Sequence, residues 1–135
     1  MQCIVVTPEA TIFDEPADFV ALPLFDGEIG IAPLHSPMIG RLGYGELRIR
    51  QGSQTRRYYV GGGFVEVASD TISILTSRAI PAKNLDPQAI AEQLASARAQ
   101  QAGSPELLES RDRQVAQARG QLRVASRGHG AAATH

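Results

Sequence analysis

A change of pattern near Ala82 constrains the fold of this 135-residue chain more than any other feature. Before it, short apolar runs are separated by turns at roughly eight to twelve residues, which is typical of a β-sandwich or barrel. After it, apolar residues recur at helical spacing. The sequence therefore predicts strands over residues 1–82, a helical hairpin over residues 83–127 and a disordered tail over residues 128–135.

The glycine run Gly61-Gly62-Gly63 lies between two of the expected strands. A phosphate-binding loop would need a Lys-Ser or Lys-Thr pair and a helix behind it. Phe64 instead opens another strand, so we interpret the run as a bulge or a tight corner of the sheet.

Two Asp/Ser-Pro pairs mark the starts of the helices. Asp86 and Ser104 are good N-cap residues, and each is followed by a proline at the first helical position. Gly103 is expected to end the first helix. The expected seam between the helices is thin and rich in alanine. The second helix contributes Leu108, Val115, Ala118, Leu122 and Ala125. The first helix and the segment after it contribute Ile90, Leu94, Ala97, Ala91, Ala95, Ala99 and Ala102.

Composition excludes several classes of function. Aromatic residues make up 5% of the chain and tryptophan is absent, which argues against a base-stacking platform. The first thirty residues contain six acidic and no basic residues, whereas five arginines and one aspartate follow Ser110. These arginines lie on one helix without interleaved aromatics, so no nucleic-acid partner is expected. No apolar run approaches bilayer length, so membrane association is expected only through another protein.

The segment from Gly27 to Pro37 contains polar groups that packing alone does not explain. Ile29 and Ile31 alternate as in a strand, but Glu28 and His35 remain, both expected on one exposed edge. Glu28 could be a solvated edge residue, and His35 a turn residue satisfied by backbone. No cluster of Cys or His ligands suggests a metal or another cofactor.

Several motifs, in order, resemble the epsilon subunit family of the proton-translocating ATP synthase. The segment Gly27-Glu28-Ile29-Gly30-Ile31-Ala32-Pro33-Leu34-His35-Ser36-Pro37 is similar to the family signature. Tyr59 to Val67 resembles its Gly-Gly hairpin, and Gln121-Leu122-Arg123-Val124 resembles the end of its second helix. The resemblance implies an α+β fold, an N-terminal antiparallel β-sandwich followed by a C-terminal antiparallel two-helix hairpin.

The resemblance also implies a function. The chain would be a non-catalytic rotor subunit of the central stalk that couples the gamma subunit to the membrane rotor ring, with alpha and beta as further partners. Its helices would inhibit ATP hydrolysis. It would lie peripherally at the cytoplasmic face of the bacterial inner membrane. Glu28 and His35 would meet the rotor ring. The beta subunit would meet the basic residues of the second helix, namely Arg111, Arg113, Arg119, Arg123 and Arg127.

Family members that bind ATP on the hairpin carry a Leu/Ile-Asp-x-x-Arg-Ala motif at the start of the first helix. Here Leu85 and Asp86 are present, but Ala89 stands where the arginine should be. Asp86 and Arg98 are the remaining candidates for a nucleotide site. Because the guanidinium that would meet phosphate is missing, we predict weak or absent ATP binding.

Two other interpretations were open. The chain could be a free-standing β-sandwich adaptor whose helical arm binds an unrelated acidic partner. An enzyme could also use His35 as a base beside Ser36. Adjacent residues on extended backbone point apart, and no orienting carboxylate follows, so the enzyme is the weaker alternative.

Overall fold

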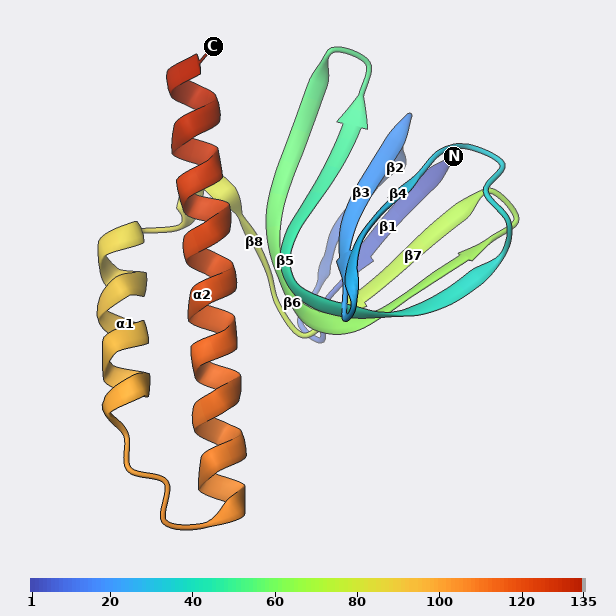
Figure 1. The fold of residues 1–135 in the computed structure, drawn as a ribbon. Coiled ribbons are helices and arrows are strands. Elements are labelled where there is room, and N and C mark those ends of the chain that lie inside the picture. The colour runs from blue at the N-terminus through green and yellow to red at the C-terminus, as the bar shows by residue number, and fades with distance from the viewer. Residues whose placement is uncertain (135) are drawn as a thin grey trace.

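A two-layered β-structure stands beside a helical hairpin (Figure 1). The computed structural model describes the backbone of residues 1–134 and the side chains of residues 1–126. The elements in chain order are β1 (Gln2–Val6), β2 (Thr11–Pro16), β3 (Phe19–Leu24), β4 (Gly27–Ile31), β5 (Met38–Gln51), β6 (Gln54–Ala68), β7 (Thr71–Thr76), β8 (Ala79–Pro81), the 3-10 helix η1 (Ala82–Asn84), α1 (Pro87–Ala99) and α2 (Pro105–Thr134).

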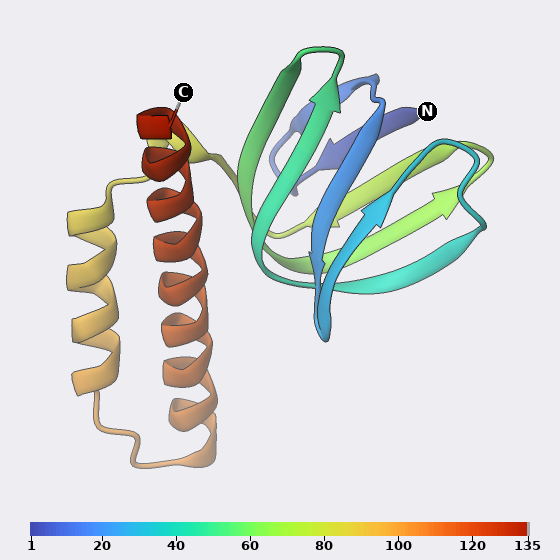
Figure 2. The same ribbon diagram turned by 45° about the horizontal axis from the view of Figure 1, so that its top comes forward.

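Within residues 1–134, one eight-stranded sheet folds over to form both layers of the sandwich (Figure 2). Its order is β2-β1-β7-β6-β5-β3-β4, and β8 pairs with β6. The two longest strands, β5 and β6, pair along nearly their whole length. The later part of β6 pairs with β7, whereas its earlier part pairs with β8. Each long strand therefore serves both layers, which confirms the sandwich expected from the sequence.

Glycines form the corner at which β6 passes from one layer to the other. Gly62 and Gly63 have φ angles of 76° and 118°, which side chains of L-residues rarely tolerate. A Cβ atom at Gly63 would overlap the carbonyl oxygen of Leu75 and lie 2.8 Å from Cα of Thr76. The prediction of a corner rather than a phosphate loop is confirmed, because strand β6 continues on both sides.

The core lies between the two layers. Burying each large aliphatic side chain contributes about 1.5–3 kcal/mol. The fully buried members are Cys3, Val5, Val20, Leu22, Ile31, Leu47, Ile49, Val60, Val65 and Ile72. Burial, with the nearby charge of Asp14, raises the pKa of the Cys3 thiol to about 12. The only cysteine of the chain therefore behaves as a small apolar side chain.

One strand pair departs from the antiparallel sandwich that was expected. β1 lies between β2 and β7, and its pairing with β7 is parallel, with Gln2 opposite Thr71 and Val6 opposite Leu75. Antiparallel neighbours can be joined by short hairpins, but parallel strands need a long connection. Here that connection is most of the sandwich, from β2 to β6.

The helical hairpin begins and turns as the sequence predicts. The Asp86 side chain accepts hydrogen bonds from the backbone N–H groups of Gln88 and Ala89 at 3.0 and 3.4 Å. The Ser104 hydroxyl accepts one from Leu107 N–H at 3.2 Å. Ile90, Leu94 and Ala97 are the buried residues of α1, as expected.

Three details of the hairpin differ from expectation. α1 ends at Ala99, before Gly103. Ala91, Ala95 and Ala99 are exposed and do not line the seam, because Ile90, Leu94 and Ala97 define the buried face. Leu108 is 43% exposed. The amide of Gln100, just beyond α1, bonds to Gln114, so the first turns of α2 project past the end of α1.

The C-terminal segment also differs from expectation. The predicted disordered tail begins at Gly128, whereas α2 continues to Thr134. Ala131, Ala132 and Ala133 have the highest helix propensity of any residue type, which favours this continuation. His135 lies outside the described residues.

Candidate functional site

Glu28 is held by a chain of charged groups on the outer face of the sandwich. It lies on edge strand β4 and accepts a hydrogen bond from Arg48 Nη2 at 2.9 Å. Arg48 Nη1 donates to Glu46 at 2.9 Å, and Arg57 forms an ion pair with the other oxygen of Glu46. The hydrogen bond to Glu46, supported by the charge of Glu28, raises the pKa of Arg48. Glu28 is therefore a positioned carboxylate whose side chain remains 46% exposed.

Glu46 is the centre of this network, and sequence reasoning missed it. Strict alternation placed it on the polar face of its strand, yet it is only 3% exposed. Both of its carboxylate oxygens are bonded to arginines, so its burial does not leave an unpaired charge. The Glu-x-Arg pattern of β5 opposite Arg57 of β6 is the signal that could have revealed it.

His35 lies in the loop that joins β4 to β5, beyond the end of the strand that carries Glu28. Its Nδ1 is 2.7 Å from the backbone oxygen of Ser36, and not bonded to the Ser36 hydroxyl. The backbone N–H of Leu34 donates to Asp70 Oδ1 at 2.9 Å, which ties this loop to the turn between β6 and β7. Glu28 and His35 make separate contacts and do not form a shared catalytic pair.

The arginines of α2 have unequal surroundings. Arg113, Arg119 and Arg123 are exposed, and half-buried Arg111 contacts Asp112 at 3.5 Å. Arg123 donates to the backbone oxygen of Tyr44 at 3.3 Å, so it contributes to packing of the hairpin on the sandwich. The side chain of Arg127 lies outside the described residues.

The hairpin docks on the sandwich through α2, which lies between α1 and the sheet (Figure 1). Gly120 allows close approach, because a Cβ atom there would lie 3.1 Å from the Tyr44 oxygen. Tyr59 and Val124 are buried in this junction. Burial raises the pKa of Tyr59. The apolar cluster that holds the hairpin on the sandwich is small and separate from the main core.

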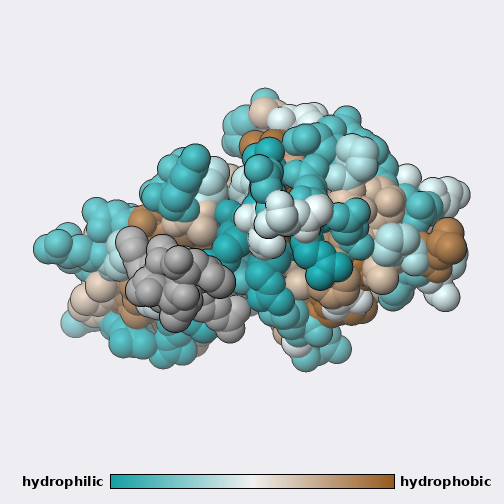
Figure 3. Space-filling view, turned by 90° about the horizontal axis from the view of Figure 1, so that it is seen from above, coloured by the Kyte–Doolittle hydropathy of each residue, from teal (hydrophilic) through white to brown (hydrophobic). Residues whose placement is uncertain are grey.

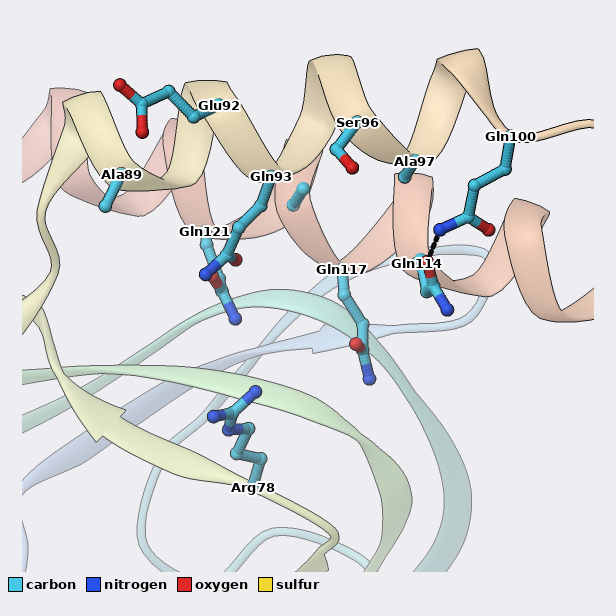
Figure 4. Close-up of a pocket in the computed structure, with 11 residues that line it drawn as sticks. Arg78, Ala89, Glu92, Gln93, Ser96, Ala97, Gln100, Gln114, Gln117 and Gln121 are labelled. Atoms are coloured by element: carbon cyan, nitrogen blue, oxygen red, sulfur yellow. Dashed lines mark hydrogen bonds between the residues drawn. The ribbon is translucent and has the colours of Figure 1, made fainter.

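A cavity of about 530 Å³ lies between the two helices and the turn before β8 (Figure 4). Arg78 reaches into it from the sandwich side, and Ala89 and Glu92 line it from α1. Its other polar groups are amides and one hydroxyl, from Gln93, Ser96, Gln100, Gln114, Gln117 and Gln121.

The candidate nucleotide residues do not assemble in this cavity. Asp86 caps α1, and Arg98 is exposed and is not part of the lining. Arg78, which sequence reasoning missed, is the cationic residue of the lining. A triphosphate would meet one arginine, one glutamate and neutral amides, which is a poor match for its charge.

We therefore expect calorimetric titration of the chain with ATP and Mg²⁺ to show no binding in the micromolar range. Ala89→Arg should strengthen binding, because it would place a guanidinium in the lining, and Ala91→Arg on the exposed face is its control. Micromolar affinity of the unchanged chain would contradict the expectation.

Two general properties bear on the class of protein. Among residues 1–126, no group of three or more His, Cys, Asp or Glu side chains is arranged to hold a metal ion. Neither helix of the described chain has a stretch long and apolar enough to cross a membrane.

Comparison with known proteins agrees with this architecture. Residues 1–82 match the family described as the ATP synthase delta/epsilon chain, beta-sandwich domain. The ATP synthase epsilon chain of Rhodopirellula baltica is 49% identical over 124 residues, which is 92% of this chain and 97% of that one. The epsilon chain of Desulforamulus reducens is 43% identical over 82 residues, which is 61% of this chain and 62% of that one.

Solved structures share the fold. A chain of the Euglena gracilis mitochondrial ATP synthase, solved with OSCP, F1 and c-ring, aligns with a TM-score of 0.79 at 22% identity. The alignment covers 87% of this chain and 76% of that one. A chain of the Tetrahymena thermophila central stalk and c-ring aligns with a TM-score of 0.73 at 15% identity, covering 93% and 96%. On the family match and the 49% identity, this chain belongs to the ATP synthase delta/epsilon chain family.

Proposed function

We propose that the chain is a non-catalytic rotor subunit of an F-type ATP synthase, in which its sandwich couples the gamma subunit to the membrane rotor ring. The observation that carries this proposal is a sandwich with an exposed apolar row on its outer face. It is supported by a fold shared with chains solved in an ATP synthase OSCP/F1/c-ring assembly and in a central stalk/c-ring assembly. The subunit would be peripheral, at the cytoplasmic face of the bacterial inner membrane, and would reach the membrane only through the complex.

The apolar row supports docking of gamma. Val6, Leu75 and Phe64 are neighbours across β1, β7 and β6. Phe64 and Leu75 are 60% and 55% exposed, although both could have been polar on a solvated face. A groove of about 320 Å³ next to the row is lined by Val6, Thr7, Pro8, Leu75, Thr76 and Ser77. Exposed apolar patches of this kind favour protein interfaces.

The contact with the rotor ring is assigned to Glu28 and His35. Glu28 is presented by Arg48, and His35 by a loop that is tied to Asp70 through its neighbour Leu34. Both groups are at least partly accessible and are fixed before any partner binds. Preorganised polar groups of this kind lose little conformational entropy on association.

The hairpin is proposed to be a brake on ATP hydrolysis. In the docked arrangement it packs on Tyr44 and Tyr59 of the sandwich, and in this arrangement it would not inhibit hydrolysis. In an extended arrangement along gamma, Arg111, Arg113, Arg119, Arg123 and Arg127 would face an acidic stretch of the beta subunit, within the alpha and beta ring. A partner can shift this equilibrium only by its different affinity for the two arrangements.

Replacing Glu28 and His35 together by alanine tests the ring contact. We expect proton pumping driven by ATP hydrolysis in the reconstituted enzyme to fall severalfold, while the melting temperature changes by no more than a few degrees, since both side chains are partly exposed. Glu9→Ala is the control, because Glu9 is exposed and belongs to neither contact. Unchanged pumping in the double variant would refute the assignment.

A further inference from the structure

Leu34 combines an unfavourable backbone conformation with a highly exposed apolar side chain. Its φ angle is 67°, in the left-handed region where a side chain larger than that of glycine or asparagine is unfavourable. Its side chain is 86% exposed, so no packing within the chain offsets this strain. Ser69 and Asp70, the other described residues with positive φ outside glycine, are short polar residues in a hairpin turn, where this conformation is common.

The loop that carries Leu34 is held in place. Asp70 Oδ1 accepts from the Leu34 N–H at 2.9 Å, and Asp70 Oδ2 lies 3.8 Å from the N-terminal ammonium group of Met1. The next residue, His35, contacts the Ser36 carbonyl oxygen. The loop therefore presents Leu34 outward in a fixed geometry. Strain that the surroundings maintain in this way is characteristic of functional sites.

The position of the loop indicates its partner. The connection between β4 and β5 lies at the end of the sandwich away from the helical hairpin (Figures 1 and 2). Hydrophobic groups interrupt the polar surface at this end of the sandwich (Figure 3). The first thirty residues carry six acidic and no basic residues, which disfavours docking on an anionic lipid surface. An exposed leucine beside polar loop residues is better suited to contact with a protein surface, which in the proposed function is the membrane rotor ring.

We infer that Leu34 is the apolar anchor through which this loop seats in the membrane rotor ring, next to the polar contact of His35. The inference rests on the proposed function, because it assigns a further residue to the same contact. Asp70 is then the positioning residue that keeps Leu34 extended from the loop. A single buried apolar anchor surrounded by polar contacts is a common arrangement in protein interfaces.

The test measures stability and ring affinity of the same variants. The full chain is assembled with alpha, beta and gamma, and its binding to liposomes that contain the rotor ring is titrated. Leu34→Gly should lower ring affinity about tenfold or more, because the anchor is lost. The same change should leave the melting temperature of the chain equal or higher by a few degrees, because glycine accepts the positive φ. If Leu34 had only a structural role, its replacement would not lower ring affinity while leaving the melting temperature unchanged or raised.

Two controls separate the anchor from the backbone. Leu34→Met keeps an apolar side chain and should retain affinity within about twofold. Ser69→Gly relieves positive φ at a nearby turn without removing an apolar group, and should leave affinity unchanged. Protein-free liposomes of the same lipids should bind none of these assemblies.

Each contrary result has a distinct meaning. If Leu34→Gly keeps full ring affinity while the Glu28→Ala/His35→Ala variant loses it, the anchor is refuted and the proposed function stands. If both variants keep full affinity, the ring contact itself is refuted. If wild-type assemblies bind protein-free liposomes and Leu34→Gly abolishes that binding, the partner is lipid and the inference is overturned.

Discussion

Gly63→Ala is expected to destabilise the chain by about 3 kcal/mol or more, the largest effect of any single methyl group considered. The added Cβ atom would have to share space with the Leu75 carbonyl oxygen, in a backbone conformation at φ 118° that alanine rarely adopts. Neither β6 nor β7 can move away without breaking the ladder between them. Thermal unfolding should show a fall in melting temperature of roughly 10 °C or more.

Gly52→Ala is the matched control. Gly52 also has a positive φ, 59°, but a Cβ atom there meets nothing within 4 Å. Its replacement should lower the free energy of unfolding only by the cost of the left-handed backbone conformation for alanine, about 1–2 kcal/mol. Equal losses in the two variants would show that conformation alone, and not the overlap with strand β7, sets the requirement for glycine at position 63.

Gly120→Leu is expected to separate the hairpin from the sandwich without unfolding either part. The side chain would be forced against the Tyr44 backbone, where a Cβ atom already lies 3.1 Å from the oxygen. Overpacking of this kind costs about 1–3 kcal/mol. This cost is comparable to the stabilisation expected from the small apolar cluster that holds α2 on the sandwich. Hydrogen-exchange protection of the Tyr59 region and of the middle of α2 should fall tenfold or more, while β1 and β7 remain protected.

Gly103→Leu is the control for this change, since a Cβ atom at Gly103 meets nothing within 4 Å.

In the assembled enzyme, Gly120→Leu should slow ATP hydrolysis if the released arm is the brake, and deletion of residues 83–135 should accelerate it. Charge reversal at Arg119 and Arg123 should relieve inhibition, less so at high salt. Faster hydrolysis with Gly120→Leu would contradict the proposed brake.

Local features of the fold could be predicted because their causes are local. Asp86 and Ser104 cap their helices through atoms two or three residues away, and the glycines at the β6 corner act through their own φ angles. The exposure of Leu108 could not be predicted. Heptad spacing identifies a stripe along α2, but it does not say where the shorter partner helix stops.

The candidate site was predictable only in part, for the same reason. Alternation along β5 assigned Glu46 to the polar face, but only tertiary structure brings Arg57 and Arg48 over it. Arg78 enters the interhelical cavity from a turn that precedes the hairpin in sequence. Leu34 belongs to the segment from Gly27 to Pro37, yet its importance appears only with its φ angle and its exposure. The roles of Glu28, His35 and the arginines of α2 remain predictions.

The parallel pairing of β1 with β7 also determines when the chain can fold during synthesis. Residues 2–6 are translated before the other strands of the sandwich, but their partner on one side, residues 71–75, is translated after every other strand except β8. Until then β1 can pair only with β2, and its other edge stays open. Closing such a distant contact is slow compared with forming hairpins. The nascent sandwich therefore carries an apolar strand with one unpaired edge through most of its translation, at the stage when protection by a chaperone matters most.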